Sequence, residues 1–103
     1  MTHLLASGSL DTTVKLWDLT SGKSLLTLSQ HVHPVTVLAF SPDGKFLATG
    51  SHDRLHVWTV RDGELARSFK NANGINDLSW SRDGHRLGGC YSDGSAYVFS
   101  VEL

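Results

Sequence analysis

Histidine and cysteine are the side chains of this chain that most readily suggest chemistry. The histidines include two close pairs, His31 with His33 and His52 with His56, and imidazole is a common zinc ligand. A separation of four residues brings two imidazoles together on a helix, but it does not do so in strands and turns. The only cysteine is Cys90, so no cysteine pair could complete such a site. The pattern predicts no metal site and no cofactor.

Nucleophilic catalysis has equally little support. Cys90 follows Gly88 and Gly89 in an apolar stretch, where a small apolar side chain is expected to pack. A catalytic thiolate would need a neighbouring base and access to solvent. The glycines form neither a dinucleotide-binding nor a phosphate-binding loop. No catalytic residue is predicted.

A stretch of about 40 residues is repeated along the chain. Leu4–Asp11 returns as Phe46–Asp53 and, more loosely, as Arg86–Asp93, so the three aspartates are 42 and then 40 residues apart. Each aspartate precedes a short turn and an apolar strand with an aromatic residue: Val14–Asp18, His56–Thr59 and Tyr97–Ser100. This period, with four short strands per unit, is typical of β-propeller blades.

The elements that must position these side chains are short strands separated by polar turns. Ser41-Pro42-Asp43-Gly44 is the strongest turn signal, because proline presets φ and glycine accepts a left-handed conformation. No helix is predicted. The expected strands are Leu4–Ser9, Val14–Asp18, Ser24–Ser29, Val35–Phe40, Phe46–Ser51, Leu55–Val60, Leu65–Phe69, Ile75–Trp80, Arg86–Tyr91 and Ala96–Val101.

We therefore predict an all-β chain, a partial β-propeller of about two and a half four-stranded antiparallel blades. Residues 1–30 form an incomplete blade, 31–70 a complete blade, and 71–103 a last blade without its outer strand. A closed propeller has at least about four blades, so the rest of a parent propeller is needed to close the ring. We expect the chain to be the C-terminal portion of a longer protein.

Composition narrows the class of protein. Nine lysines and arginines oppose ten aspartates and glutamates, giving a net charge of −1, and the two signs are interleaved. Direct binding to nucleic acid through a basic stripe is not expected. A single cysteine fits a reducing compartment, and neither a membrane-spanning run nor a signal peptide is recognisable. The sequence thus predicts an intracellular, soluble protein that does not bind a membrane.

The residues that mark the turns and strand ends of the repeat resemble those of the WD-repeat family over essentially the whole chain. They comprise Ala6-Ser7-Gly8-Ser9 with Asp11, the Ser41–Gly44 turn, and Trp17-Asp18. The order of motifs along the chain is similar to that in the C-terminal blades of transducin-beta-like 1 proteins. It includes His31 with Pro34-Val35, followed by Ser92-Asp93-Gly94-Ser95 in a blade without its usual tryptophan. The chain departs from that pattern at two positions: it has Gln30 in place of glycine and Thr59 in place of aspartate.

This resemblance implies a nuclear scaffold subunit of a histone-deacetylase corepressor complex, with other corepressor and histone-deacetylase subunits as partners. The localisation it implies is the nucleus. The dimerisation and F-box-like regions of that family have no counterpart in these 103 residues.

The resemblance also implies a buried hydrogen-bond relay in each blade. In the second unit its members are His31, Thr49, Asp53 and Trp58, with imidazole passing the chain of hydrogen bonds to the carboxylate. The first unit retains Ser7, Asp11 and Trp17. The third has Asn71, Gly89 and Phe99 in those places and keeps only Asp93, so a less rigid blade is expected. The substitution Asp53→Ala is expected to cost a few kcal/mol of stability, because it would leave the buried network unsatisfied.

Serine, histidine and aspartate together could also suggest a hydrolase. In the relay, however, the hydroxyl bonds to imidazole inside a packed sheet and does not stand beside an oxyanion hole. We therefore predict a structural set with no enzymatic activity.

Binding is expected at exposed turns held by a rigid scaffold. In the resembled family, the loops before the first strand and after the second form the usual docking surface. The corresponding candidates here are Leu10, Val32, His33, His52, Asn73 and Tyr91. Leu10 and Tyr91 are favoured because large side chains dominate binding energies.

Alternative functions remain open at this point. One is a WD scaffold of another assembly, such as a ubiquitin-ligase substrate receptor or a G-protein-beta-like signalling module. An enzyme is a second alternative, and a non-functional truncated product a third. In isolation, the open sheet edges and apolar faces predict aggregation or self-assembly.

Overall fold

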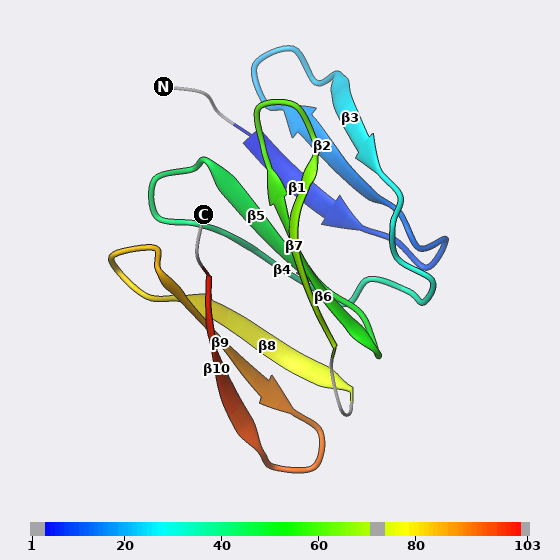
Figure 1. Cartoon of the computed structure of the whole chain (residues 1–103). Coiled ribbons are helices and arrows are strands. Elements are labelled where there is room, and N and C mark those ends of the chain that lie inside the picture. The colour runs from blue at the N-terminus through cyan, green and yellow to red at the C-terminus, as the bar shows by residue number, and fades with distance from the viewer. Residues whose placement is uncertain (1–3, 71–73, 102–103) are drawn as a thin grey trace.

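The computed structural model describes residues 4–70 and 74–101. Within these ranges the chain forms ten β-strands (Figure 1), and no helix there is long and apolar enough to cross a membrane. The strands are β1 (Leu4–Gly8), β2 (Val14–Asp18), β3 (Ser24–Leu28), β4 (Val37–Phe40), β5 (Phe46–Gly50), β6 (Arg54–Thr59), β7 (Leu65–Lys70), β8 (Ile75–Trp80), β9 (Arg86–Tyr91) and β10 (Ala96–Ser100).

The strands form three antiparallel sheets that follow one another along the chain. The first sheet has the order β1-β2-β3, the second β4-β5-β6-β7, and the third β8-β9-β10. Each is a meander, because every strand pairs with its neighbour in sequence. The all-β prediction is confirmed, and the three sheets are successive blades of a partial propeller.

The turns have the conformations that their residues favour. In the β4–β5 turn, Asp43 Oδ1 accepts hydrogen bonds from Ser41 Oγ (2.6 Å) and from the Lys45 amide (2.9 Å), and Gly44 has a φ of 73°. The β8–β9 turn repeats this arrangement with Ser81, Asp83 and Gly84. An aspartate that bonds its own backbone, followed by a left-handed glycine, reverses the chain without strain.

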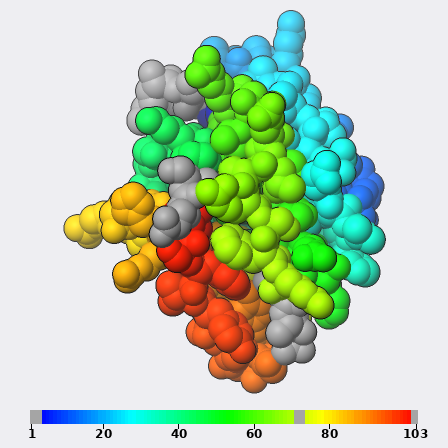
Figure 2. All heavy atoms as spheres, in the orientation of Figure 1, coloured from blue at the N-terminus to red at the C-terminus, as the bar shows by residue number. Residues whose placement is uncertain are grey.

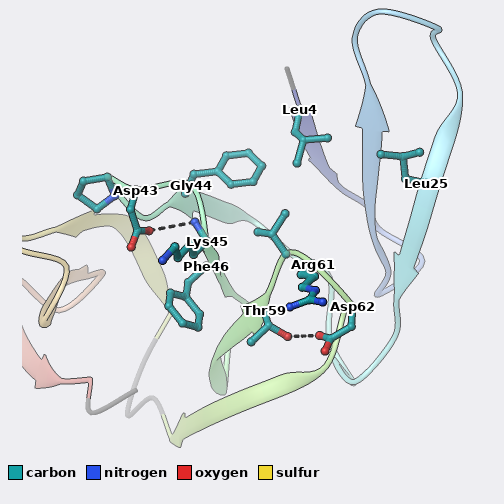
Figure 3. Close-up of a pocket in the computed structure, with 12 residues that line it drawn as sticks. Leu4, Leu25, Asp43, Gly44, Lys45, Phe46, Thr59, Arg61 and Asp62 are labelled. Atoms are coloured by element: carbon teal, nitrogen blue, oxygen red, sulfur yellow. Dashed lines mark hydrogen bonds between the residues drawn. The ribbon is translucent and has the colours of Figure 1, made fainter. Parts of the chain in front are cut away.

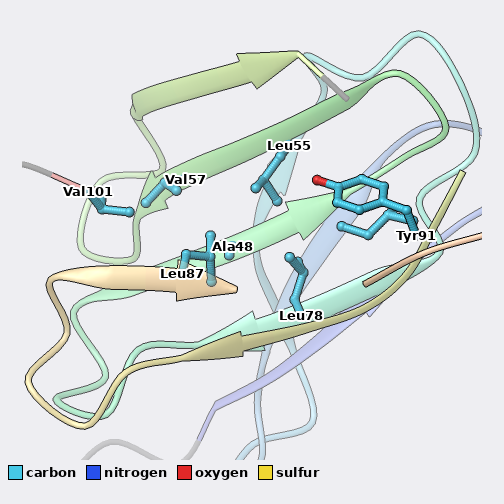
Figure 4. Close-up of a cluster of buried hydrophobic side chains, with 8 residues drawn as sticks. Ala48, Leu55, Val57, Leu78, Leu87, Tyr91 and Val101 are labelled. Carbon is cyan, nitrogen blue, oxygen red and sulfur yellow. The ribbon is translucent and has the colours of Figure 1, made fainter. Parts of the chain in front are cut away.

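Two hydrophobic cores lie between the sheets. The first sheet packs against the second through Val14, Leu16, Leu28, Val35, Leu47 and Trp58. The second packs against the third through Ala48, Leu55, Val57, Ile75, Leu78, Leu87, Tyr91 and Val101 (Figure 4). Because neighbouring residues of a strand point to opposite faces, Leu47 and Ala48 contribute to different cores. The second sheet is therefore covered on both faces.

The predicted strand ends differ from the observed ones by at most two residues, and the largest difference is at β4. Val35 was expected to open this strand, yet its amide donates to the Ser9 carbonyl (3.2 Å) in the β1–β2 turn. The buried Val35 side chain joins the core between the first and second sheets. Val35 thus ties one sheet to the next, while the following Thr36 amide donates to the Gly50 carbonyl of β5 (2.9 Å).

Candidate functional site

The most extensive cluster of buried, hydrogen-bonded polar side chains belongs to the second sheet and the loop before it. The Trp58 indole N–H donates to Thr49 Oγ1 (2.8 Å), and the same oxygen lies 2.6 Å from His31 Nε2. Thr49 and Trp58 come from the paired strands β5 and β6, whereas His31 comes from the loop before β4. All three side chains are buried. The structure therefore brings together three of the four expected relay members.

Asp53, the fourth expected member, is not hydrogen-bonded to His31. Its carboxylate accepts a hydrogen bond from Ser51 Oγ (3.2 Å) and lies 3.7 Å from His33 Nε2, with 38% of the side chain exposed. His31 Nδ1 has no hydrogen-bond partner in the described part of the chain. The expected link from imidazole to carboxylate is thus wrong, because Asp53 lies in the β5–β6 turn and faces the exposed His33.

A second buried imidazole, His56, stands beside this cluster and was missed from the sequence. Its ring centroid lies 4.3 Å from that of His31 and 5.6 Å from that of Trp58. Neither ring nitrogen has a hydrogen-bond partner of good geometry among residues 4–70 and 74–101, although the Gln30 backbone lies near enough to favour a higher pKa of the ring against the effect of burial. Comparison of the three repeats did not indicate His56, because the equivalent residues in the first and third repeats are Lys15 and Tyr97. Strand alternation could have found it, since His56 lies two residues from Trp58 and on the same face.

The buried imidazoles are held in the neutral form. Burial, assisted by the neighbouring His56, lowers the pKa of His31 to about 4, although Asp53 acts in the opposite direction. Burial likewise lowers the pKa of His56. Neutral rings that pack edge to face or tilted against an indole can stabilise a sheet, whereas a nucleophile needs an accessible hydroxyl. Thr49 is fully buried, so this cluster suits a structural role.

The first sheet keeps a shorter version of the cluster. The Trp17 indole donates to Ser7 Oγ (2.9 Å), and both side chains are only partly buried. Asp11 accepts hydrogen bonds from the Thr13 amide (3.0 Å) and hydroxyl (2.6 Å). These bonds lower the pKa of the exposed Asp11 carboxylate. Asp11 therefore shapes its own turn and is not hydrogen-bonded to Trp17 or Ser7.

Tyr91 fills the corresponding space in the third sheet. Only 4% of this residue is exposed, and its ring contacts Tyr97 edge to face at 5.5 Å. A Cβ atom added to Gly89, which stands where Thr49 stands in the second sheet, would lie 3.2 Å from the Tyr91 hydroxyl oxygen. The prediction of Tyr91 as an exposed partner-binding residue is wrong, because the absent relay side chains leave room for its ring in the core.

The other partner-binding candidates in the described ranges lie at one end of the sheets, which we call the partner end. It carries the β1–β2, β5–β6 and β9–β10 turns and the β3–β4 loop. Leu10 is 86% exposed and Val32 75%, and the exposed His33 and His52 rings lie 5.9 Å apart. Asn73, the remaining candidate, falls outside the described residues. A groove of about 520 Å³ opens beside His52, between Pro34, Val37 and Ile75.

A larger groove, of about 1040 Å³, lies at the opposite end between the first and second sheets. Figure 3 shows Leu4 and Leu25 on the first-sheet side, with Phe46 and the β4–β5 and β6–β7 turns on the other. Lys45 and Arg61 stand at these turns. The carboxylates of Asp43 and Asp62 accept hydrogen bonds from the Lys45 and Glu64 amides of their own turns. No residue of this groove was predicted as functional.

The remaining chemical candidates stay apart from one another. Cys90 is exposed, contrary to the expectation that it packs as a small apolar side chain. Among the described residues, no three histidine, cysteine, aspartate or glutamate side chains are arranged to hold a metal ion.

Known proteins share this repeat. The family model described as WD domain, G-beta repeat matches residues 2–18, 22–59 and 63–100. The chain is 43% identical to F-box-like/WD repeat-containing protein TBL1X of Mus musculus, over 95% of the chain and 19% of that protein. It is 38% identical to WD40 repeat-containing protein HOS15 of Arabidopsis thaliana, over 96% of the chain and 16% of that protein. It is also 45% identical to a coronin-like protein of Saccharomyces cerevisiae, over 82% of the chain and 13% of that protein.

The chain spans less than a fifth of the length of these relatives. The matched segments 22–59 and 63–100 begin one strand before the second and third sheets, at β3 and β7. Each of these two repeats thus joins the outer strand of one sheet to three strands of the next. With three matched repeats and the strand order that they require, the chain belongs to the WD-repeat family.

Proposed function

We propose that this chain is a non-catalytic scaffold that presents the turns of the partner end to other proteins. The observation that carries the proposal is the exposure of Leu10 and Val32 next to buried anchors. Leu10 follows Ser9, whose carbonyl accepts the Val35 amide, and Val32 follows the buried His31. Exposed apolar side chains on a fixed backbone lose little conformational entropy on binding.

We further propose that the parent protein is a transducin-beta-like subunit of a nuclear corepressor complex that contains a histone deacetylase. The motif order and the 43% identity to TBL1X support this proposal. Membership of the WD-repeat family alone does not carry it, since the coronin-like protein is equally similar over a shorter part of the chain. A scaffold of another assembly, such as a ubiquitin ligase, is the second candidate.

Affinity capture separates the two candidates. The tagged chain is incubated with a nuclear extract, and the bound proteins are identified by mass spectrometry and assayed for histone deacetylase activity. The corepressor proposal expects deacetylase activity on the chain, reduced at least fivefold by the double substitution Leu10→Ser, Val32→Ser. Leu19→Ser is the matched control, because Leu19 is 58% exposed in the β2–β3 turn at the opposite end.

The proteins recovered in this experiment decide between the two candidates. Ubiquitin-ligase subunits in place of deacetylase would favour the second candidate. Partner recovery that is unchanged by the double substitution but lost with Leu19→Ser would overturn the assignment of binding to the partner end.

A further inference from the structure

The larger groove, at the end opposite to the partner end, contains side chains that the proposed function does not use. It lies between the first and second sheets. These sheets are consecutive, and in a repeat architecture each unit packs only against its neighbours in sequence. Further blades of a parent propeller would therefore not come between the two walls. In Figure 2 the cyan atoms of β3 adjoin the green atoms of the second sheet. We call this space the interblade groove.

We propose that the interblade groove binds an extended acidic peptide of a partner protein, in which an aliphatic residue stands between two acidic ones. Lys45 and Arg61 would bind the carboxylates, and the aliphatic side chain would lie against Leu25 and Val60. The groove volume of about 1040 Å³ is at the top of the range of about 300–1,000 Å³ found for small-ligand pockets. It can therefore hold several residues. Such a peptide would bind independently of the partner end.

Two cations stand at the rim, on adjacent turns of the second sheet. The Val60 amide donates to the Lys45 carbonyl (2.9 Å), which ties the β6–β7 turn to the β4–β5 turn. Arg61 follows Val60, and Figure 3 shows the side chains of both cations among those that line the groove. Both residues are exposed, and neither forms an ion pair with a described residue. They are therefore available to form charge-assisted hydrogen bonds with the carboxylates of a ligand.

The two aspartates of the groove are engaged by their own turns. Asp43 accepts a hydrogen bond from Ser41 Oγ (2.6 Å) and Asp62 accepts one from Thr59 Oγ1, in addition to those from backbone amides. These bonds lower the pKa of both carboxyl groups, because they stabilise the charged form. Two charges of each sign thus balance formally. The attraction for an acidic peptide must come from direct contact with the cations and not from a long-range field.

A β-bulge places Leu25 in the apolar wall of the groove. The register between β2 and β3 shifts after the Leu16–Leu26 pair, which leaves Leu25 as the extra residue. A bulge re-aims a side chain, and Leu25 lines the groove although 53% of the residue is exposed. The second sheet has the same bulge with Ala66 as its extra residue. The fold thus accepts alanine at this position, so the exposed leucine is better explained by binding.

Fluorescence anisotropy with short labelled peptides tests the proposal on the purified 103-residue chain. The probes are pentapeptides of the forms Ser-Asp-X-Asp-Ser and Ser-Glu-X-Glu-Ser, in which X is leucine, isoleucine, valine or methionine. For the tightest of them, replacing both acidic residues by their amides should weaken binding at least fivefold. Replacing X by serine should have an effect of the same size. Absence of binding by every probe would overturn the proposal.

Two substitutions test the cations. Lys45→Met and Arg61→Met remove the charges but keep most of each apolar stem, and circular dichroism checks that the strand content is retained. The double variant should bind the acidic peptide at least tenfold more weakly, while its affinity for the amide peptide changes less than twofold. The matched control is Lys23→Met with Arg82→Met, which removes two exposed charges from the β2–β3 and β8–β9 turns of the same end. It should change the affinity less than twofold.

A third substitution tests the apolar wall. Leu25→Ala introduces the residue type that the second sheet has at this position, and it should weaken the acidic and the amide peptide alike, at least threefold. Equal weakening of the acidic peptide by the two double variants would overturn the proposal, because it indicates an effect of net charge alone. Unchanged binding by the Lys45→Met, Arg61→Met variant would do so too. So would tighter binding of an oligo-uridine RNA that this variant loses, because the cations would then bind nucleic-acid phosphates.

Discussion

Replacing Thr49 by valine should destabilise the chain more than any other loss of a single hydroxyl group in these clusters. Valine has nearly the shape of threonine, so the substitution removes the polar atom without opening a cavity. Thr49 Oγ1 accepts the Trp58 indole N–H at 2.8 Å and lies 2.6 Å from His31 Nε2. Both partners are buried, with exposures of 2% and 5%, so water cannot replace the hydroxyl.

The magnitude follows from the two groups that are left without a partner. A buried polar group that loses its hydrogen bond costs about 1–3 kcal/mol, so Thr49→Val, which leaves two such groups, should cost about 2–6 kcal/mol. A domain of this size has a total stability of about 5–15 kcal/mol, and each kcal/mol shifts Tm by roughly 4–8 °C. We expect a fall in Tm of about 10 °C or more.

Urea unfolding followed by far-ultraviolet circular dichroism measures the difference, at one protein concentration because association would add stability. Ser7→Ala is the matched control, since Ser7 accepts the Trp17 indole at 2.9 Å in a partly exposed site. It should cost only about 1 kcal/mol, because water can bond the indole there. Thr49→Ser keeps the hydroxyl and should recover most of the loss. If Thr49→Val proved as mild as Ser7→Ala, the buried hydroxyl could not be what stabilises the second sheet.

Three further predictions concern the same structure. Burial lowers the pKa of His31 from 6.5 to about 4 and also lowers that of His56, so the unfolded chain binds more protons below about pH 6.5. Stability should thus be full above that pH and fall by on the order of 3 kcal/mol as the pH drops to about 4; pH-independent unfolding in urea would contradict this. Asp53→Ala should cost less than about 1 kcal/mol by the same assay, because its carboxylate is partly exposed and makes no hydrogen bond to His31, and a loss above about 2 kcal/mol would restore it to the relay. Thr12 has a φ of 75°, where the third repeat has Gly94 at 86°, so Thr12→Gly should raise stability by about 0.5–1 kcal/mol while Gly94→Ala lowers it; a lower Tm for Thr12→Gly would argue against strain at this turn.

The repeat explains why so much of the fold was predictable. A strand of five residues has a weak individual signal, but the equivalent stretches around Asp11, Asp53 and Asp93 support one another. The turns at Ser41–Gly44 and Ser81–Gly84 are local, since their hydrogen bonds join residues at most five apart. Such contacts depend on residue types that are adjacent in the sequence.

The candidate site was less predictable, because its contacts depend on which side chains a core brings together. The motif identified His31, Thr49 and Trp58, but it also assigned Asp53, whose turn faces His33 instead. His56 has no counterpart of the same type in the other repeats, so no repeated pattern marked it. Its burial follows from the stacking of the second sheet on the first.

The sequence alone determined the class of this protein: its period, its aspartate turns and its apolar strands require short antiparallel sheets that stack on one another. Only the tertiary structure decided which of the equivalent residues are buried. Tyr91 occupies the core because Gly89 leaves it room, whereas Leu5 and Val98 are exposed because they lie on the two faces that no other sheet of the described chain covers. Residue type and spacing fix local conformation, but burial depends on the volume and position of neighbours that lie far away in the sequence.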